Sequence, residues 1–221
     1  MESKSIIKVN GRASLRITPN TTRIDLSLEK VLPTNEEASQ MAAANLKKLG
    51  DIVENCGLDR DLPKTTHFSI SKSYHFVKED GTYNGDKELD GYKLVLNLQI
   101  ELDMDNELLT RVVQGIARNM KDMEIKILFS VKDPQSYQLK LLENAVKDAT
   151  DKARVMATAA GCTLGQVASI EYQGYGRSLR ITQEEYSVEY EEYELADFSD
   201  FTPKAIEEHE DVTIQWYLEK G

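Results

Sequence analysis

The chain has 221 residues, 40% of them hydrophobic, and is long enough to bury the core of one large domain or two small ones. Its 27 Lys and Arg against 38 Asp and Glu give a net charge of −11, which would repel phosphates, so we expect no nucleic-acid partner. No apolar run approaches the roughly 20 residues that cross a bilayer, and residues 1–5 lack the apolar stretch of an export signal. We therefore expect no transmembrane segment and a cytoplasmic location, or a periplasmic one if an export signal has been removed.

Alternating apolar and polar residues predict two strands at the start of the chain. Within residues 5–18, one parity carries Ile7, Val9, Ala13, Leu15 and Ile17, and residues 24–28 repeat the pattern. Since only a short stretch with Pro19 and Asn20 separates the two runs, we expect them to pair as an antiparallel hairpin. Gly11 interrupts the first run, and we interpret it as a bulge.

A helix is predicted next, and two further strands follow it. Thr34 and Glu37 have the spacing of a capping box, and Gly57 stands where a helix ends in a left-handed residue. The apolar stripe of this helix should lie on the opening hairpin. Alternating runs over residues 68–76 and 92–102 predict the strands.

The second half of the chain predicts two helices and three strands. A short helix begins at Asp105, and a strand follows over residues 125–131. A long helix then runs from Asp133 and Pro134 to Gly161. Its inward stripe consists mostly of alanines, which would let it approach a sheet closely. Strands over residues 167–172 and 212–218 complete the pattern.

These elements predict an α+β fold, a mostly antiparallel sheet with amphipathic helices packed on one face, in the order β-β-α-β-β-α-β-α-β-β. We expect a single domain over residues 1–221, with two lobes, 1–103 and 104–221, as a subdivision.

Residues 176–203 form an acidic, Tyr-rich excursion between the last two predicted strands. Residues 183–200 carry eight carboxylates and no Lys or Arg. As a strand-like arm, this stretch would have an aromatic face, and its candidate interaction residues are Tyr186, Val188, Tyr190, Tyr193 and Leu195. Either the arm packs its tyrosines on another subunit, or it is a solvated excursion whose charge prevents aggregation.

The sequence offers no pattern for a catalytic, cofactor or metal site. The histidines, His67, His75 and His209, lack metal-ligand spacing, and there is no phosphate-binding loop or nucleophile elbow. We therefore expect no catalytic residue, no cofactor and no metal. Cys56 and Cys162 are interpreted as small buried residues at helix ends, with a reactive or bridging thiol as the alternative.

A series of short motifs in the second half resembles the SIMPL-domain family. The resemblance rests on the stretch 129–133, on Ala145-Val146-Lys147-Asp148-Ala149, on Ala160-Gly161 and on Leu164-Gly165. Val9-Asn10-Gly11, Gly91-Tyr92 and Trp216-Tyr217-Leu218 are similar to the family pattern in the same order. This family includes bacterial periplasmic immunogenic proteins and a eukaryotic kinase-associated signalling protein.

The resemblance implies an α+β protein with no agreed enzymatic activity and no catalytic residue set. It also implies ring-like assembly in some members and a link to envelope or oxidative stress in others. We therefore expect a non-enzymatic protein that acts by self-assembly, as a homo-oligomer, or by binding a protein partner. The alternative is a small-ligand-binding protein or an unrecognised enzyme with a cleft between the lobes.

Overall fold

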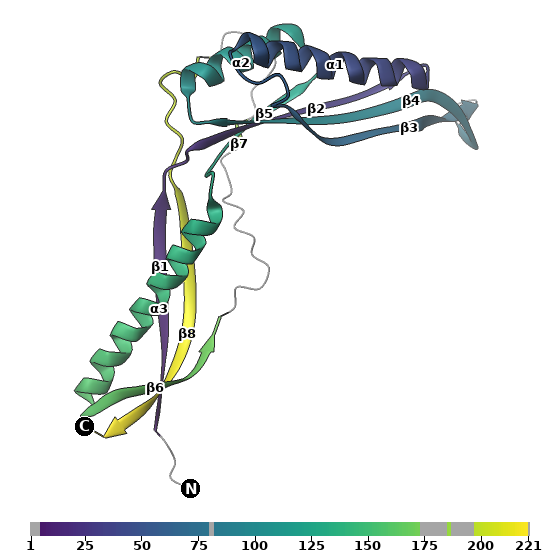
Figure 1. Cartoon of the computed structure of the whole chain (residues 1–221). Coiled ribbons are helices and arrows are strands. Elements are labelled where there is room, and N and C mark those ends of the chain that lie inside the picture. The colour runs from purple at the N-terminus through teal and green to yellow at the C-terminus, as the bar shows by residue number, and fades with distance from the viewer. Residues whose placement is uncertain (1–4, 80–81, 173–184, 187–196, 221) are drawn as a thin grey trace. The chain divides into compact units, whose positions relative to one another are not determined.

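The computed structural model describes residues 5–79, 82–172, 185–186 and 197–220, and it has the expected α+β architecture (Figure 1). The predicted order of elements is confirmed, with the two-residue β7 added before the last strand. The elements are β1 (Ile6–Ile17), β2 (Thr21–Leu32), α1 (Asn35–Asn55), β3 (Lys64–Glu79), β4 (Thr82–Asp103), α2 (Asn106–Asn119), β5 (Glu124–Ser130), α3 (Pro134–Ala159), β6 (Cys162–Glu171), β7 (Glu185–Tyr186) and β8 (Ile206–Lys220).

The chain divides into two compact units that are interleaved in sequence. Unit 1 comprises Met1–Pro19, Val131–Gln183 and Lys204–Gly221, and unit 2 comprises Asn20–Ser130 and Glu184–Pro203. This division does not follow the boundary near residue 104 at which we expected two lobes to meet. Each unit has a sheet of its own, and all strand pairs are antiparallel.

Unit 1 contains a three-stranded sheet in the order β1-β8-β6. β1 pairs with β8 from Ile6↔Tyr217 to Ile17↔Ile206, so the predicted hairpin between β1 and β2 is wrong. The alternating pattern identifies a strand and its dry face, but it does not identify the neighbouring strand. The partner of β1 is at the other end of the chain, and Val212, Ile214 and Trp216 of β8 complete the apolar face of the sheet.

Helix α3 covers one face of this sheet, as its alanines predict. Ala145, Ala149 and Ala153 are fully buried against Val9 and the buried face of β8. A Cβ atom at Gly11 would collide with the carbonyl oxygen of Ala145 and with Ala149. The pairing of β1 with β8 continues through Gly11↔Val212 without a shift, so Gly11 is not a bulge. It is a point at which the helix lies directly against the strand.

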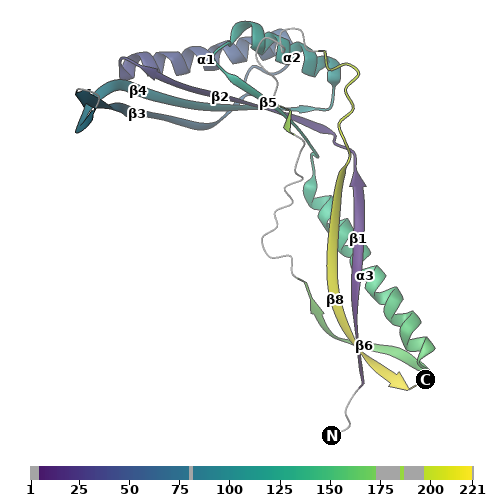
Figure 2. The same cartoon turned by 180° about the vertical axis from the view of Figure 1, so that it is seen from behind.

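Unit 2 contains a five-stranded sheet in the order β3-β4-β2-β5-β7. Helices α1 and α2 cover one face of it, which is seen from two sides in Figures 1 and 2. Their buried residues form one core with the inward side chains of β2, β4 and β5, including Ile24, Leu96 and Ile127. The stripe of α1 therefore lies on β4 and β2, not on the predicted opening hairpin.

The helix ends follow the predicted local chemistry. The Thr34 hydroxyl accepts a hydrogen bond from the Glu37 amide at 3.1 Å, and Asp105 and Asp133 cap α2 and α3 in the same way. Gly57 and Gly161, with φ of 85° and 71°, follow the ends of α1 and α3. Within the described residues, no helix is both long and apolar enough to cross a membrane.

Candidate functional site

Most of the predicted interaction residues lie outside the described part of the chain. Tyr186 is in β7, where it pairs with Ile127 of β5. Val188, Tyr190, Tyr193 and Leu195 fall in the stretch 187–196, which the structure does not describe. The interaction role of these five residues therefore stays a prediction.

The end of the acidic segment is anchored on α2, which the sequence did not reveal. The rings of Phe201 and Phe129 stack with centroids 5.2 Å apart, and Phe198 meets Phe201 edge-on at 6.2 Å. Asn106 of α2 donates to the Phe201 carbonyl at 2.7 Å, and Thr110 accepts from the Phe198 amide at 2.9 Å. In this part of the predicted excursion 176–203, Phe198 and Phe201 thus pack against the core of unit 2.

The strongest candidate surface is an exposed strand at the edge of the five-stranded sheet. We define the β3 edge as residues His67–Phe76. In this range β3 contributes no extra residue to a bulge, and among the described strands its neighbour is β4 alone. Phe68, Tyr74 and Phe76 are each 52% exposed, although their alternation places them on the apolar, helix-covered side of the sheet. Three half-exposed aromatic side chains on one strand face form an apolar surface of a kind that usually serves contact.

A bulge in β4 enlarges this apolar surface. Ser73 is paired with Gly91 and Tyr74 with Leu89, so Asp90 is the extra residue. The insertion turns Leu89, which is 49% exposed, toward the side that carries Tyr74. At the end of this row the ammonium of Lys87 lies 4.8 Å from the centroid of the Phe76 ring, which is a cation–π contact.

The opposite face of the β3 edge is small and polar. Ser69, Ser71 and Ser73 alternate along it, and His75 Nδ1 lies 2.6 Å from an Asp90 carboxylate oxygen. Residues 64–78 of β3 contain no Asp or Glu, and the first carboxylate of the strand is Glu79 at its end. In a chain with a net charge of −11, a carboxylate-free strand of this length is the sequence signal that could have identified the surface.

The edge strands of unit 1 have features that hinder pairing with a further strand, and the β3 edge lacks these features. On β1, Lys8, Arg12 and Arg16 project charges, and the Arg12 amide donates to the Asp148 carboxylate of α3 at 2.8 Å. Hydrogen bonds from the Lys152 ammonium and then from the Arg12 amide lower the pKa of Asp148. The other edge strand, β6, has register shifts between Leu164 and Ser169 that break its regular pairing edge.

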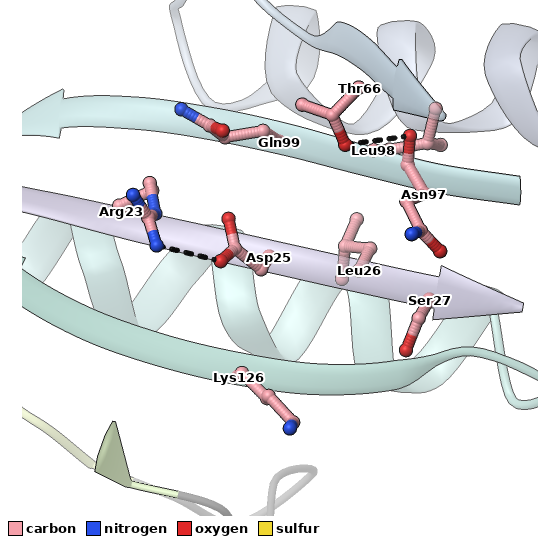
Figure 3. A pocket seen from close by; sticks show the side chains of 9 residues that line it. All are labelled: Arg23, Asp25, Leu26, Ser27, Thr66, Asn97, Leu98, Gln99 and Lys126. Carbon is pink, nitrogen blue, oxygen red and sulfur yellow. Dashed lines mark hydrogen bonds and ion pairs between the residues drawn. The ribbon is translucent and has the colours of Figure 1, made fainter. Parts of the chain in front are cut away.

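A second candidate is a shallow concavity of about 280 Å³ on the face of the five-stranded sheet opposite α1 and α2 (Figure 3). The Arg23 guanidinium pairs with Asp25 at 3.1 Å, and Lys126 lies 3.7 Å from Glu124, so both cations have carboxylate partners. Its lining thus offers hydrogen bonds to a neutral polar molecule. The lining residues contain no His or Cys, and they are Arg23, Asp25, Leu26, Ser27, Thr66, Asn97, Leu98, Gln99 and Lys126.

No three of the described His, Cys, Asp and Glu side chains lie close enough to hold a metal ion. Cys56 and Cys162 are free thiols of intermediate burial, and partial burial raises the pKa of Cys56 despite the nearby Arg111. A raised pKa leaves less thiolate at neutral pH, which makes Cys56 a weaker nucleophile.

Comparison with known proteins identifies the family. Residues 7–216 match the family described as "SIMPL: Protein of unknown function (DUF541)". The chain is also similar to a protein named "Uncharacterized protein YggE" from Edwardsiella ictaluri (strain 93-146), with 22% identity over 169 residues that cover 75% of this chain and 67% of the relative. Because the family match spans nearly the whole sequence, the chain belongs to the SIMPL family.

Proposed function

We propose that this protein acts without catalysis, by self-assembly or by binding another protein. The observation that carries the proposal is the β3 edge, where Phe68, Tyr74 and Phe76 stay half-exposed on the outer strand of the described five-stranded sheet. Exposing three aromatic rings to water is unfavourable, and covering them by association would remove that cost.

The residues of the family motifs support the non-catalytic part of the proposal. Gly11, Ala145 and Ala149 allow α3 to lie directly on β1, and Asp148 caps an amide at the edge of that strand. Trp216 is 4% exposed in the core of unit 1. These side chains build a scaffold, and such roles favour a binding protein over an enzyme.

The experiment is to measure the mass of the purified full chain by mass photometry and sedimentation velocity, from nanomolar to about 100 µM concentration. A defined oligomer, or a mass that rises with concentration, supports self-assembly. A monomer throughout this range contradicts self-assembly and leaves binding of another protein as the part to be tested.

The predicted arm is tested in the same measurement by replacing Tyr186, Tyr190 and Tyr193 with Ser. Deletion of residues 183–200 is less informative, because it would also remove Phe198 from the core of unit 2. If the arm contacts another subunit, the substitutions lower the mass of the assembly. An unchanged mass favours the solvated alternative.

Binding of a small polar molecule is the second candidate function, and the concavity of Figure 3 favours it. We expect a ligand there to depend on the side-chain amides of Asn97 and Gln99, which lie on the face of the sheet opposite α1 and α2. A screen of neutral polar compounds by thermal shift, repeated with Asn97→Ala and Gln99→Ala, tests this function. A stabilisation that both variants retain would place the ligand elsewhere.

A stress- or envelope-related role is a proposal that rests on the family resemblance alone. Fractionation of cells that produce the natural protein would assign its compartment and so test the envelope part of this proposal.

A further inference from the structure

We propose that the β3 edge pairs antiparallel with the β3 edge of a second copy of this chain, around a two-fold axis at Ser71. The inference rests on the proposed function and names its partner and its surface. Such a contact is isologous, because each copy contributes the same residues. It would join the two five-stranded sheets into one continuous sheet.

The first argument is the state of the strand itself. Natural proteins usually protect an edge strand by keeping it short, by adding charges or proline, by a bulge, or by covering it. Over residues 67–76, β3 is ten residues long, without proline or carboxylate and with Lys72 as its single permanent charge. The β1 edge, by contrast, has Asp148 bound to an outward amide and three cations along the strand.

The second argument is charge, which selects the register. Residues opposite each other in an antiparallel pair lie on the same face of the sheet, so the two-fold axis must pass through a residue. The two copies of the β3 edge overlap over the greatest length when that residue is Ser71 or Lys72. An axis at Lys72 would place two ammonium groups side by side, and like charges directly opposite are destabilising. An axis at Ser71 separates them and sets Lys72 opposite Ile70.

The same register matches the apolar side chains. With the axis at Ser71, Phe68 lies opposite Tyr74 on the helix-covered side, twice per contact. Aromatic pairs across an antiparallel ladder are among its most stabilising contacts. On the other face Ser69 lies opposite Ser73, and these small side chains let the two backbones pair without a clash.

The small area of the contact predicts a weak association. Each half-exposed aromatic ring has on the order of 100 Å² left to bury, so two rings, the strand backbone and the stems of Ile70 and Lys72 give less than the roughly 800 Å² per partner of a standard interface. We therefore expect a reversible dimer with a dissociation constant in the micromolar range, on the order of 1–100 µM.

The test compares two variants with the same change in charge. Ser71→Glu places two carboxylates together on the axis, and it leaves the fold intact because Ser71 is exposed. Ser14→Glu makes the same change on the exposed face of β1 in unit 1. By sedimentation equilibrium we expect Ser71→Glu to raise the dissociation constant at least about tenfold and Ser14→Glu to leave it unchanged.

A cross-link tests the register directly. Residues on the axis of an antiparallel pair have Cα atoms about 4.5–5.5 Å apart, a distance that a disulfide spans. Both cysteine variants are made in a chain whose own thiols are removed by Cys56→Ala and Cys162→Ala. Under mild oxidation, the chain with Ser71→Cys should form a covalent dimer faster than the chain with Ser14→Cys.

The outcomes separate this inference from the proposed function. A dimer that Ser71→Glu weakens and Ser71→Cys traps supports the inference, and so does a larger assembly whose mass Ser71→Glu reduces. An assembly that neither variant affects overturns the β3 contact and leaves self-assembly standing. A wild-type chain that is monomeric up to about 100 µM overturns both the contact and self-assembly.

Discussion

At the scale of single residues, the family motif acts through packing and hydrogen bonding. Asp148 shows this most clearly, since its carboxylate accepts from the Arg12 amide at 2.8 Å and from the Lys152 ammonium at 2.6 Å. The first contact fills a position on β1 to which another strand could otherwise bind. Asp148 therefore both ties α3 to β1 and closes the edge of the sheet.

Asp148→Ala should lower the thermal midpoint of unit 1 by about 2–4 °C at pH 7. The folded pKa of Asp148 is depressed, so its stabilisation is fully present above the unfolded pKa of about 4 and is lost as the pH falls through the folded value. The gap between wild type and variant should therefore narrow below about pH 4. The two thermal midpoints are measured at each pH by Trp216 fluorescence during heating.

The matched control is Asp151→Ala on the same helix, where the carboxylate forms an exposed pair with Arg154 at 3.4 Å. Exposed pairs of this kind contribute little, so the control should differ from wild type by less than Asp148→Ala at pH 7. Equal effects from both substitutions would show that the cap on the Arg12 amide is not what stabilises unit 1.

At the scale of elements, the contact between α3 and β1 depends on the absence of a side chain at position 11. A methyl group there would meet the Ala145 carbonyl oxygen, a backbone atom that cannot rotate away. A Gly→Ala change in a strand often stabilises by restricting the unfolded chain. Here the clash outweighs that gain, because relieving it requires the whole helix to move.

Gly11→Ala should therefore destabilise unit 1 by about 1–3 kcal/mol. Asn10→Ala is the matched control, because Asn10 is the exposed neighbour on the opposite face of β1. The stability of both variants is measured by urea unfolding, with Trp216 fluorescence as the signal. Asn10→Ala should leave the unfolding midpoint nearly unchanged. A Gly11→Ala chain as stable as wild type would mean that α3 does not approach β1 as closely as described.

At the scale of the whole molecule, each unit buries apolar residues of its own, and these come from interleaved segments. The core of unit 2 includes Leu109, which is 1% exposed, and the core of unit 1 includes Trp216. Trp216 is the single tryptophan of the chain, so its fluorescence reports on unit 1. Separate cores make a single unfolding free energy an incomplete description of the chain.

Leu109→Ala should destabilise unit 2 by about 2–5 kcal/mol through the cavity it leaves. The far-UV circular dichroism signal should then begin to change at lower urea, because α1 and α2 belong to unit 2. The midpoint of Trp216 fluorescence should stay where it is in the wild type. A parallel shift of both signals would show that the two units unfold together.

The net charge affects association of the whole chain. Two copies that each carry −11 repel one another, and raising the ionic strength from about 0.01 to about 0.15 M shortens the Debye length from about 30 to about 8 Å. We therefore expect the dimer dissociation constant to fall as NaCl is added, measured by sedimentation equilibrium. Weaker association at high salt would indicate that ion pairs hold the copies together.

The local features of the fold were predictable from the sequence because they depend on neighbouring residues. Alternation with a period of two marked the strands, and the caps at Thr34, Asp105 and Asp133 marked the starts of the helices. The alanine stripe of α3 predicted its close approach to a sheet, and the family was recognised from short motifs.

The strand partners and the candidate surface were decided by tertiary structure. Val9 and Ile24 lie in equally alternating runs, yet one strand pairs with β8 and the other with β4 and β5. Likewise, Phe68 and Leu96 lie opposite each other in apolar patterns, and only Leu96 is covered by the helix layer. Periodicity shows which side of a strand is apolar. Strand pairing and burial depend on segments far away in the chain, so only the folded structure shows which strands pair and which side chains are buried.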